Sequence, residues 1–543
     1  MIIISDPTRR LNAMPNILVA DSLSKEGLEV FQQTPGFKVD YKPEIQLDEL
    51  KQIIGNYEGL VIRSRAQVPA EALERPGKLK VIGRAGVGVD NVDVSAATAK
   101  GVIVMNTPGG NTISTAENTL SLLLCLARSV HKADATMKAG KWEKKSIKGV
   151  ELAGKVVGVI GLGRIGMEVA KRCAAFDMEV IGFDPFTSKD VAARMGIELV
   201  DLDTIWARAD FITVHTPLND ETRGLIGREQ IARMKPTVRL INCARGGIID
   251  EEALLEALKD GRIAGAALDV FTVEPLPADH PFRKFDNLVL MPHLSASTAE
   301  AQEKVAVDIA RQIVECLTGR PVRNAVNAPS LDPEALEAAR PFLDLAERLG
   351  KFLAQYVAGP IERFSIKYCG SVLEHPTQAI STAAQVGYLS AQSEPGQINY
   401  VNAPFLMKQR GVEVIESRSS ELFAYANLIT LEAHRPGGDK VAVSGTLFTR
   451  STPRIVMLND KHLDAWPKGT IIVIENKDVP GVIGAVGTTL GNHGVNIAQM
   501  TWGRSAPGGD AITILNCDQA IDPAVLKALS ALNFVQAVRV IRL

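Results

Sequence analysis

Three residues of complementary chemistry stand just beyond strand-like runs in the middle of the chain: Arg245, Glu274 and His293. Oxidation of a 2-hydroxy acid needs a group that moves the hydroxyl proton, and histidine suits this because its pKa lies near neutrality. A carboxylate such as Glu274 would orient that imidazole and favour its charged form. A guanidinium such as that of Arg245 would hold the substrate carboxylate. A charged loop residue is more often solvated than catalytic, so the spacing alone leaves these roles open.

A glycine-rich turn at 161–166 follows the short apolar run Val156–Ile160, which predicts a buried parallel strand. Each glycine has a physical role in binding a dinucleotide. Gly161 allows the tight turn, Gly163 lets the backbone approach a pyrophosphate, and Gly166 lets helix and strand pack closely. The turn alone is a weak signal, because glycine-rich turns are common.

The residues after the turn strengthen this interpretation. Apolar residues recur at helical spacing from Met167 to Phe176, so the positive end of this helix would face the phosphates. A second strand-like run, Glu179 to Phe183, ends on Asp184. Its carboxylate would accept hydrogen bonds from a ribose 2′-hydroxyl and repel a 2′-phosphate. The pattern favours NAD over NADP, and the alternative is an α/β turn that binds no phosphate.

Composition narrows the class of protein. The 543 residues suffice for roughly three or four domains. The 60 basic and 62 acidic residues nearly balance, so the net charge of the chain does not favour binding to nucleic acid or to an anionic membrane. The sequence has no bilayer-length apolar run and no signal-peptide pattern. The six cysteines lack metal-ligand spacing, so we expect buried reduced thiols, no metal site and a cytoplasmic location.

The elements before Thr107 predict a parallel sheet with helices on both faces, because strand-like and helical runs alternate. The strand-like runs are residues 17–20, 37–41, 59–64, 79–84 and 102–107. Such sheets bind ligands beyond the carboxyl ends of their strands, where Arg63-Ser64-Arg65 and Arg84 with Gly86 stand. These turns could form a cradle for an anion. The equal alternative is that these arginines are solvated charges on surface loops and bind no anion.

A capping-box pattern at Ser114 and Glu117 predicts a long buried helix from Ser114 to Val130, which would join the first sheet to a second one. That second sheet would continue through residues 210–218, 238–247, 263–271 and 287–298. A further long helix, Ala299 to Leu317, could then return the chain to the first sheet. The dinucleotide-binding domain would be inserted in a split substrate domain, with the active site between them.

Five motifs resemble, in order and spacing, the D-isomer-specific 2-hydroxyacid dehydrogenase family. They are GLGRIG (161–166), HTPLNDETRGLI (215–226), NCARGGIIDEEAL (242–254), ALDVFTVEP (267–275) and PHLSAST (292–298). RAGVGVDNVD (84–93) and NTPGGNTISTAE (106–117) resemble the substrate half of that family. The resemblance implies that Arg245 binds the substrate carboxylate, that His293 is the acid/base and that Glu274 is its partner.

The same resemblance implies cofactor and substrate contacts. The implied cofactor contacts are Gly161, Gly163, Arg164, Ile165, Gly166, Asp184, Thr216, Cys243, Ala244, Asp269 and Ser295. The implied substrate contacts are Arg63, Ser64, Arg84, Gly86 and Asn111. Ser295 departs from the glycine that members usually carry, and its hydroxyl could tighten the nicotinamide pocket. Val87 stands where some members have threonine, which removes one possible cofactor hydrogen bond.

The arginine cradle and the C-terminal extension resemble family members that oxidise 3-phospho-D-glycerate to 3-phosphooxypyruvate at the start of serine synthesis. The resemblance implies this substrate, NAD as the cofactor, and a homodimer or homotetramer. One alternative is a reductase of glyoxylate or hydroxypyruvate, against which the cradle and the extension argue. Another is a non-catalytic, NAD-sensing interaction protein, which the intact catalytic trio disfavours.

The chain changes character after a boundary at 324–332. Residues 333–357 show helical periodicity, and mixed α and β runs follow up to 468. This part resembles the intervening domain of the same family members, regarded as an anion-binding allosteric module. A spacer that positions its neighbours is the equal alternative.

From Thr470 the order of runs is βαββαβ, which is ferredoxin-like. With NKDVPGVIG (476–484) and GVNIAQM (494–500), this segment resembles an ACT domain, a module that senses small molecules. L-serine is the implied effector, and Asn476, Asp478 and Asn496 are the implied contacts. Asn476 departs from the bulkier side chain of some serine-sensitive members. The alternative is a dimerising domain that binds no ligand.

We therefore predict an α/β protein of four domains. A flavodoxin-like split substrate domain comprises 15–110 and 299–328, and a Rossmann-type NAD-binding domain comprises 111–298. An α+β intervening domain at 329–468 and a ferredoxin-like ACT domain at 469–543 follow.

Overall fold

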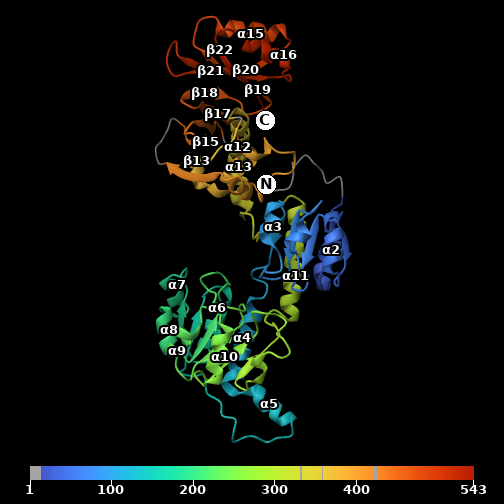
Figure 1. The fold of residues 1–543 in the computed structure, drawn as a ribbon, viewed down its shortest axis with the longest axis vertical. Coiled ribbons are helices and arrows are strands. Elements are labelled where there is room, and N and C mark those ends of the chain that lie inside the picture. Colours follow the sequence, from blue (N-terminus) through green and yellow to red (C-terminus); the bar gives the residue numbers. More distant parts are fainter. Residues whose placement is uncertain (1–13, 330–332, 358, 420–424, 450) are drawn as a thin grey trace. The chain divides into compact units, whose positions relative to one another are not determined.

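The computed structural model describes residues 14–329, 333–357, 359–419, 425–449 and 451–543 (Figure 1). The described chain forms two compact units. The first holds the residues up to Asn106 and those from Ile309 onward, and the second holds Thr107–Asp308 with Ser24–Glu26. The predicted boundary at 324–332 lies partly outside the described residues, and the division into four domains stays a prediction.

The N-terminal sheet of the first unit is entirely parallel, with strand order β2-β1-β3-β4-β5. This is the predicted flavodoxin-like order. Its strands are β1 (Asn16–Val19), β2 (Lys38–Tyr41), β3 (Gly59–Ile62), β4 (Val81–Arg84) and β5 (Ile103–Met105). Helices α1 (Lys25–Gln32), α2 (Leu47–Ile53) and α3 (Val94–Ala99) connect them.

Helix α11 (Ala299–Leu317) brings the chain back to this sheet, as predicted. Gly83 in β4 lies against the helix, and a Cβ at that position would come within 2.5 Å of the Ile313 side chain. The absent side chain therefore allows Ile309 and Ile313 to pack directly on the sheet, where both are fully buried.

The second unit is built on a seven-stranded parallel sheet with order β12-β11-β10-β9-β6-β7-β8. This is the predicted doubly wound order, whose switch point lies between β6 and β9. Its strands are β6 (Val156–Ile160), β7 (Glu179–Phe183), β8 (Glu198–Leu199), β9 (Phe211–Val214), β10 (Arg239–Asn242), β11 (Gly265–Leu268) and β12 (Leu288–Leu290). Its helices are α4 (Thr112–Arg128), α5 (Val130–Lys138), α6 (Arg164–Ala174), α7 (Lys189–Arg194), α8 (Leu202–Arg208), α9 (Arg228–Arg233) and α10 (Glu251–Lys259).

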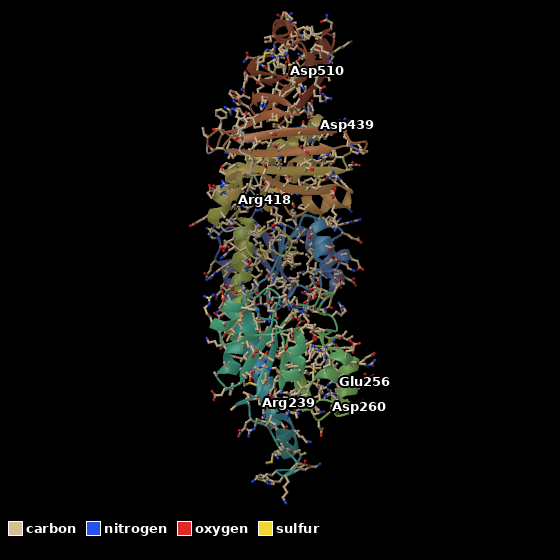
Figure 2. The ribbon with its side chains drawn as sticks, turned by 90° about the vertical axis from the view of Figure 1, so that its left-hand side faces the viewer. Arg239, Glu256, Asp260, Arg418, Asp439 and Asp510 are labelled. Atoms are coloured by element: carbon tan, nitrogen blue, oxygen red, sulfur yellow. The ribbon has the colours of Figure 1, made fainter. Side chains whose placement is uncertain are left out.

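Helix α10 of this unit is amphipathic. On α10, Leu254 and Leu258 are buried against the sheet, whereas Glu256 and the following Asp260 are exposed at the surface (Figure 2). Asp250 caps the helix by accepting a hydrogen bond from the Ala253 N–H at 2.8 Å.

Helix α4 corrects one sequence prediction. It begins at Thr112 rather than at Ser114, its N-cap residue is Asn111, and no side chain caps it. Ser114 therefore lies in the first turn, where its hydroxyl donates to the backbone oxygen of Ser295 at 2.6 Å. The capping box does not form, because the helix begins two residues earlier and Ser114 is therefore not its N-cap residue.

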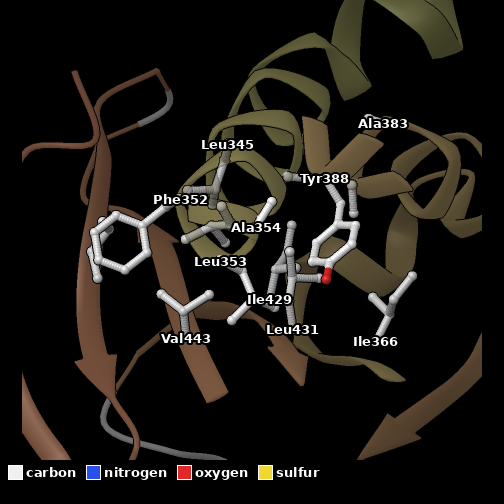
Figure 3. Close-up of a cluster of buried hydrophobic side chains, with 14 of the residues drawn as sticks. Leu345, Phe352, Leu353, Ala354, Ile366, Ala383, Tyr388, Ile429, Leu431 and Val443 are labelled. Atoms are coloured by element: carbon white, nitrogen blue, oxygen red, sulfur yellow. The ribbon is translucent and has the colours of Figure 1, made fainter. Parts of the chain in front are cut away.

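The third sheet has order β14-β13-β15-β16-β17-β18 and is antiparallel except for the β13–β14 pair. Its strands are β13 (Arg363–Gly370), β14 (Glu413–Ser419), β15 (Asn427–His434), β16 (Lys440–Leu447), β17 (Pro453–Leu458) and β18 (Lys461–Ala465). Helix α12 (Pro333–Val357) packs against α13 (Thr377–Ser390) and the sheet, while α14 (Ala403–Gln409) precedes β14. Figure 3 shows Phe352 and Leu353 of α12 pointing into the core with Ile429 and Val443.

The C-terminal segment confirms the ferredoxin-like prediction, since its four strands have order β20-β21-β19-β22 and are antiparallel. Its elements are β19 (Thr470–Lys477), α15 (Val482–Asn492), β20 (Ile497–Arg504), β21 (Asp510–Cys517), α16 (Pro523–Ser530) and β22 (Val535–Arg542). One side of the sheet packs on α15 and α16, through residues such as Ile474, Val486 and Leu529.

The other side of this C-terminal sheet belongs to the α12 core. Ile471, Val473, Ile512, Ile514 and Ile541 are at most 3% exposed and form one hydrophobic cluster with the side chains of α12. Two polar contacts join the same surfaces. The Tyr356 hydroxyl donates to Glu475 at 2.7 Å, and the Gln355 amide pairs with both backbone groups of Arg542 at 3.0 Å. The intervening and C-terminal segments therefore share one core.

Candidate active site

Three neighbouring strands of the second unit bring Arg245, Glu274 and His293 together. Because β10, β11 and β12 are adjacent and parallel, the segments that follow them leave from the same edge of the sheet. Glu274 Oε2 lies 2.7 Å from His293 Nδ1, and Glu274 Oε1 accepts a hydrogen bond from the Phe271 N–H at 3.0 Å. The predicted imidazole–carboxylate pair is therefore present.

The charge of Glu274 fixes which nitrogen of His293 faces the reaction. Partial burial works against ionisation, but hydrogen bonds from His293 and the Phe271 N–H, together with the charge of Arg245, outweigh it. They hold the pKa of Glu274 below its ordinary value. An ionised carboxylate only accepts hydrogen bonds, so Nδ1 carries the proton and Nε2 is left for a substrate. The His293 side chain is 47% exposed and thus accessible.

The turn that carries His293 is held by Asp269. The His293 backbone is left-handed, with φ of 54°, and its N–H donates to the Asp269 backbone oxygen at 2.9 Å. The fully buried Asp269 carboxylate accepts the N–H groups of Leu294 and Ser295, each at 2.8 Å. The Asp269 carboxylate therefore holds the turn that carries His293. That Asp269 or Ser295 also contacts the cofactor stays a prediction.

The loop that carries Arg245 is organised by Asn242, a buried residue that the sequence analysis did not single out. The Asn242 amide donates to the Arg245 backbone oxygen at 2.8 Å and accepts the Ala244 N–H at 2.9 Å. Gly246 lies so close to the segment after β11 that a Cβ there would be 2.0 Å from the Phe271 backbone. This close approach places Arg245 near enough to contribute to the low pKa of Glu274.

The glycine-rich turn has the geometry that a dinucleotide pyrophosphate requires. Gly161 has a φ of 92°, and a Cβ on Gly166 would come within 1.9 Å of the Gly161 oxygen. Gly163 is the N-cap of α6, with no side-chain cap and no atom within 4 Å of where its Cβ would be. Arg164 and Ile165 form the first turn, so the open helix end fits an anionic group.

Asp184 and Thr216 flank this turn. The Asp184 carboxylate accepts the N–H groups of Leu162, Phe186 and Thr187 at 2.8–3.0 Å. Since a carboxylate has about four acceptor positions, one is left for a ribose hydroxyl. The Thr216 hydroxyl is buried and has no hydrogen-bond partner. A buried hydroxyl without a partner is costly, so a bound ligand would satisfy it. The site fits NAD on these observations.

Cys243 and His215 are both neutral side chains near this site. Burial raises the pKa of the Cys243 thiol to about 12, which keeps it from acting as a thiolate. Burial lowers the pKa of His215 to about 4, and its Nδ1 is buried without a hydrogen-bond partner. His215 was missed by the sequence analysis, although it stands directly after β9 at the switch point.

In the first unit, the predicted anion cradle is shaped by a residue that sequence reasoning missed. Asp21, two residues after the end of β1, is 4% exposed. Its carboxylate accepts the N–H groups of Arg63, Arg65 and Ala66 at 2.9–3.1 Å. The Arg65 guanidinium donates to the backbone oxygens of Ala20 and Pro43. Arg65 is thus a structural residue.

The remaining predicted substrate contacts lie in both units. Arg63 and Ser64 follow β3, and Arg84 ends β4. Gly86 has a φ of 154°, and a Cβ there would be 1.7 Å from Arg84 Nη1, so a side chain would displace the guanidinium. Asn111 belongs to the second unit, where its Oδ1 is buried without a hydrogen-bond partner. That these residues hold the substrate stays a prediction.

The three predicted effector contacts all have partners in the C-terminal segment. Buried Asn476 donates to the Lys477 oxygen at 2.9 Å and accepts from the Thr513 hydroxyl at 3.0 Å. Asp478 accepts from Arg504 at 2.7 Å, a contact that lowers the pKa of Asp478, and from the Gly508 N–H at 3.0 Å. The Asn496 amide donates to Asp518 at 2.6 Å.

The described residues offer neither a metal site nor a membrane span. They contain no group of three or more His, Cys, Asp or Glu side chains placed to hold a metal ion. None of the helices among them is long and apolar enough to cross a bilayer.

Three family descriptions match successive parts of the chain. They are the NAD binding domain of D-isomer specific 2-hydroxyacid dehydrogenases at 120–295, the D-3-phosphoglycerate dehydrogenase intervening domain at 338–459, and the ACT domain at 470–534. D-3-phosphoglycerate dehydrogenase of Archaeoglobus fulgidus is 43% identical over 522 residues, 95% of this chain and 98% of that protein. The enzyme of Bacillus subtilis is 38% identical over 532 residues, 98% of this chain and all of that protein.

Solved structures match more than half of the chain. A protein from Thermus thermophilus aligns with a TM-score of 0.54 and 35% identity, over 57% of this chain and 99% of that one. The apo-structure of D-lactate dehydrogenase from Escherichia coli aligns with a TM-score of 0.51 and 27% identity, over the same shares of the two chains.

Proposed function

The chain belongs to the D-3-phosphoglycerate dehydrogenase family, and we infer from this that it oxidises 3-phospho-D-glycerate to 3-phosphooxypyruvate with NAD, the first step of L-serine synthesis. The observation that carries the proposal is the 2.7 Å contact between Glu274 and His293, which lies near Arg245 at the strand ends of a dinucleotide-binding sheet. This pair supplies the proton acceptor that the oxidation needs.

The residues of the second unit divide the chemical work between them. Bound NAD would accept the hydride from C2 of the substrate. His293 Nε2 takes the C2 hydroxyl proton, and the ionised Glu274 carboxylate stabilises the imidazolium that forms. Arg245 holds the substrate carboxylate beside the imidazole. In the reverse direction the same imidazolium returns the proton.

The cofactor would lie across the switch point. Gly163, Arg164 and Ile165 at the open end of α6 would bind the pyrophosphate, and Asp184 would bind the ribose. Thr216, Cys243, Ala244, Asp269 and the backbone of Ser295 complete the set of proposed cofactor contacts.

The substrate phosphate would be held by the cradle of the first unit. Arg63 and Arg84 supply the positive charge, while Ser64 and Gly86 supply a hydroxyl and a backbone group. Asn111 of the second unit is a further proposed substrate contact, through its amide. This cradle distinguishes the proposed substrate from glyoxylate and hydroxypyruvate, which carry no phosphate.

The ACT domain suggests regulation by an amino acid, and we propose L-serine. The Asp478 carboxylate would bind its ammonium group, and the amides of Asn476 and Asn496 would bind its carboxylate. Binding between two such domains would require a homo-oligomer, a dimer or a tetramer. We also propose a cytoplasmic location, which the six free cysteines support.

The test is NADH absorbance on mixing the protein with NAD and 3-phospho-D-glycerate at mildly alkaline pH, with a trap for phosphooxypyruvate. We expect NADH that depends on the substrate and less of it when L-serine is added. Activity indifferent to L-serine would refute the effector and leave the dehydrogenase. An absence of NADH, together with reduction of glyoxylate or hydroxypyruvate, would reassign the substrate.

A further inference from the structure

Ser295 joins three elements of the second unit at one buried point. It is 4% exposed, and its hydroxyl donates to the Asp269 carboxylate. The same hydroxyl accepts from the Asn118 amide of α4 at 3.0 Å. Its backbone oxygen accepts from the Ser114 hydroxyl of α4 at 2.6 Å. The turn after β12 is thereby attached both to the end of β11 and to the first turns of α4. These contacts are here called the Ser295 clamp.

The clamp also reaches the loop that carries Arg245. The Asn118 amide that donates to Ser295 lies 3.9 Å from Cys243 Sγ. Cys243 stands two residues before Arg245, and Ser295 stands two residues after His293. Asn118 therefore contacts both loops that carry the proposed catalytic side chains.

The backbone of His293 needs such support. A left-handed φ of 54° is strained for a residue with a side chain, and it persists only where the surroundings enforce it. The imidazole itself is half-exposed and is held on one side by Glu274. Small movements of a catalytic group cost much of the rate. The 293–295 turn is fixed from its buried side by Asp269 and α4.

We propose that Ser295 is a positioning residue whose hydroxyl, through Asp269 and Asn118, fixes the turn that presents His293 to the substrate. The inference rests on the proposed function and adds a role to a residue that the resemblance assigns to the cofactor. Because both partners of its hydroxyl are protein groups and its surface is nearly all buried, Ser295 acts on the reaction through His293.

The kinetic test uses Ser295→Ala, Asn118→Ala and the double variant. Ser297→Ala, exposed in the same loop, is the matched control. The readouts are the dissociation constant of NADH, KM for 3-phospho-D-glycerate, and kcat per NADH-binding site, which corrects for unfolded protein. We expect Ser295→Ala to lower kcat about three- to tenfold, the effect of one lost hydrogen bond, with both binding constants almost unchanged. The double variant should be no slower than the slower single variant, because both changes break one clamp.

Several results would refute the proposed positioning role of Ser295. One is an unchanged kcat in Ser295→Ala, and another is a double variant whose losses multiply. A weakened NADH affinity that accounts for the whole loss would assign Ser295 to the cofactor instead.

Crystal structures of the wild type and Ser295→Ala separate this inference from the proposed function without any turnover. We expect residues 293–295 to shift away from Asp269 in the variant while the rest of the second unit superimposes. An unshifted His293 turn would refute the clamp even if the enzyme is active. If the wild type is inactive but the turn shifts in Ser295→Ala, the proposed dehydrogenase function is refuted, whereas the role of Ser295 in fixing the turn is supported.

Discussion

Two buried aspartates play the same part in the two units. Asp21 lies two residues after the end of β1 and Asp269 directly follows β11, and each accepts backbone N–H groups from a loop that carries proposed functional side chains. A carboxylate that receives two or three N–H groups tolerates burial because hydrogen bonds replace its water. The loops with Arg63 and His293 therefore have defined conformations although their own side chains are accessible.

His293→Ala tests the acid/base role. We expect kcat to fall at least about 100-fold, because a positioned general base contributes that much, while the affinity for NADH changes little. The measurement is steady-state NADH formation together with NADH fluorescence titration. Glu274→Gln should give a smaller loss, since it keeps the shape but not the charge. Wild-type turnover in His293→Ala would remove the residue from the reaction.

His215 makes the stability of the protein depend on pH. Its pKa is about 4 in the folded state and 6.5 ordinarily, so between these values only the unfolded chain binds the proton. The free energy of unfolding should therefore fall as the pH drops from 6.5 towards 4, by at most about 3 kcal/mol. Urea unfolding at pH 7 and pH 5 measures this difference.

In His215→Gln the difference between pH 7 and pH 5 should be smaller than in the wild type. His493→Gln, at an exposed position, is the control and should behave as the wild type. An identical pH dependence in His215→Gln would show that other groups carry it.

At the residue scale, the sequence was informative where the chemistry of a side chain determines its use. Residue type suggested His293 as an acid/base, Glu274 as its partner and Arg245 as a carboxylate binder, and the family motifs implied the same roles. The structure brings the three side chains together, and their roles stay a prediction. Ser114 was misassigned as an N-cap residue, since the helix begins at Thr112 and the Ser114 hydroxyl instead contacts Ser295, 181 residues away in the chain. Local patterns do not reveal such contacts.

At the element scale, two glycines of the turn before α6 should behave differently. Gly166→Ala should lower stability even without cofactor, because its Cβ would meet the Gly161 oxygen at 1.9 Å and push the helix from the strand. Gly163→Ala meets nothing within 4 Å, so it should keep the stability and lose NAD affinity only. Thermal unfolding of the free protein and NADH titration provide the comparison. Equal stability of both variants would contradict the assigned roles.

Long periodic elements were predicted most closely. Helix α11 at Ala299–Leu317 and strands β6 and β7 have the expected bounds, because each combines a clear apolar period with glycine or polar residues at its ends. Strands β8 and β18 were missed. β8 has two residues and both strands lie at sheet edges, so neither carries a full apolar pattern.

At the scale of the whole molecule, the shared core predicts that the C-terminal segment cannot be removed without damage. A chain shortened to end at Lys468 loses Ile471, Val473, Ile512, Ile514 and Ile541 from the cluster around α12. We expect a lower unfolding temperature and increased binding of a hydrophobic dye, because buried apolar surface becomes exposed.

Val473→Ala in the full-length chain provides the matched change, since it opens a cavity in the shared core without deleting a domain. Val486→Ala, in the cluster under α15 and α16, is the control for a loss confined to the C-terminal segment. Unchanged unfolding of the shortened chain would mean that the two segments are independent.

The same shared core bears on how the protein is made. Helix α12 ends at Val357, but the side chains that cover part of it include Ile541. At a synthesis rate of about 5–20 residues per second, that helix would wait on the order of 10–40 s for its last partners to leave the ribosome. Throughout this interval the nascent chain presents an apolar helix surface, which a chaperone can bind and which a stalled, incomplete product would keep exposed.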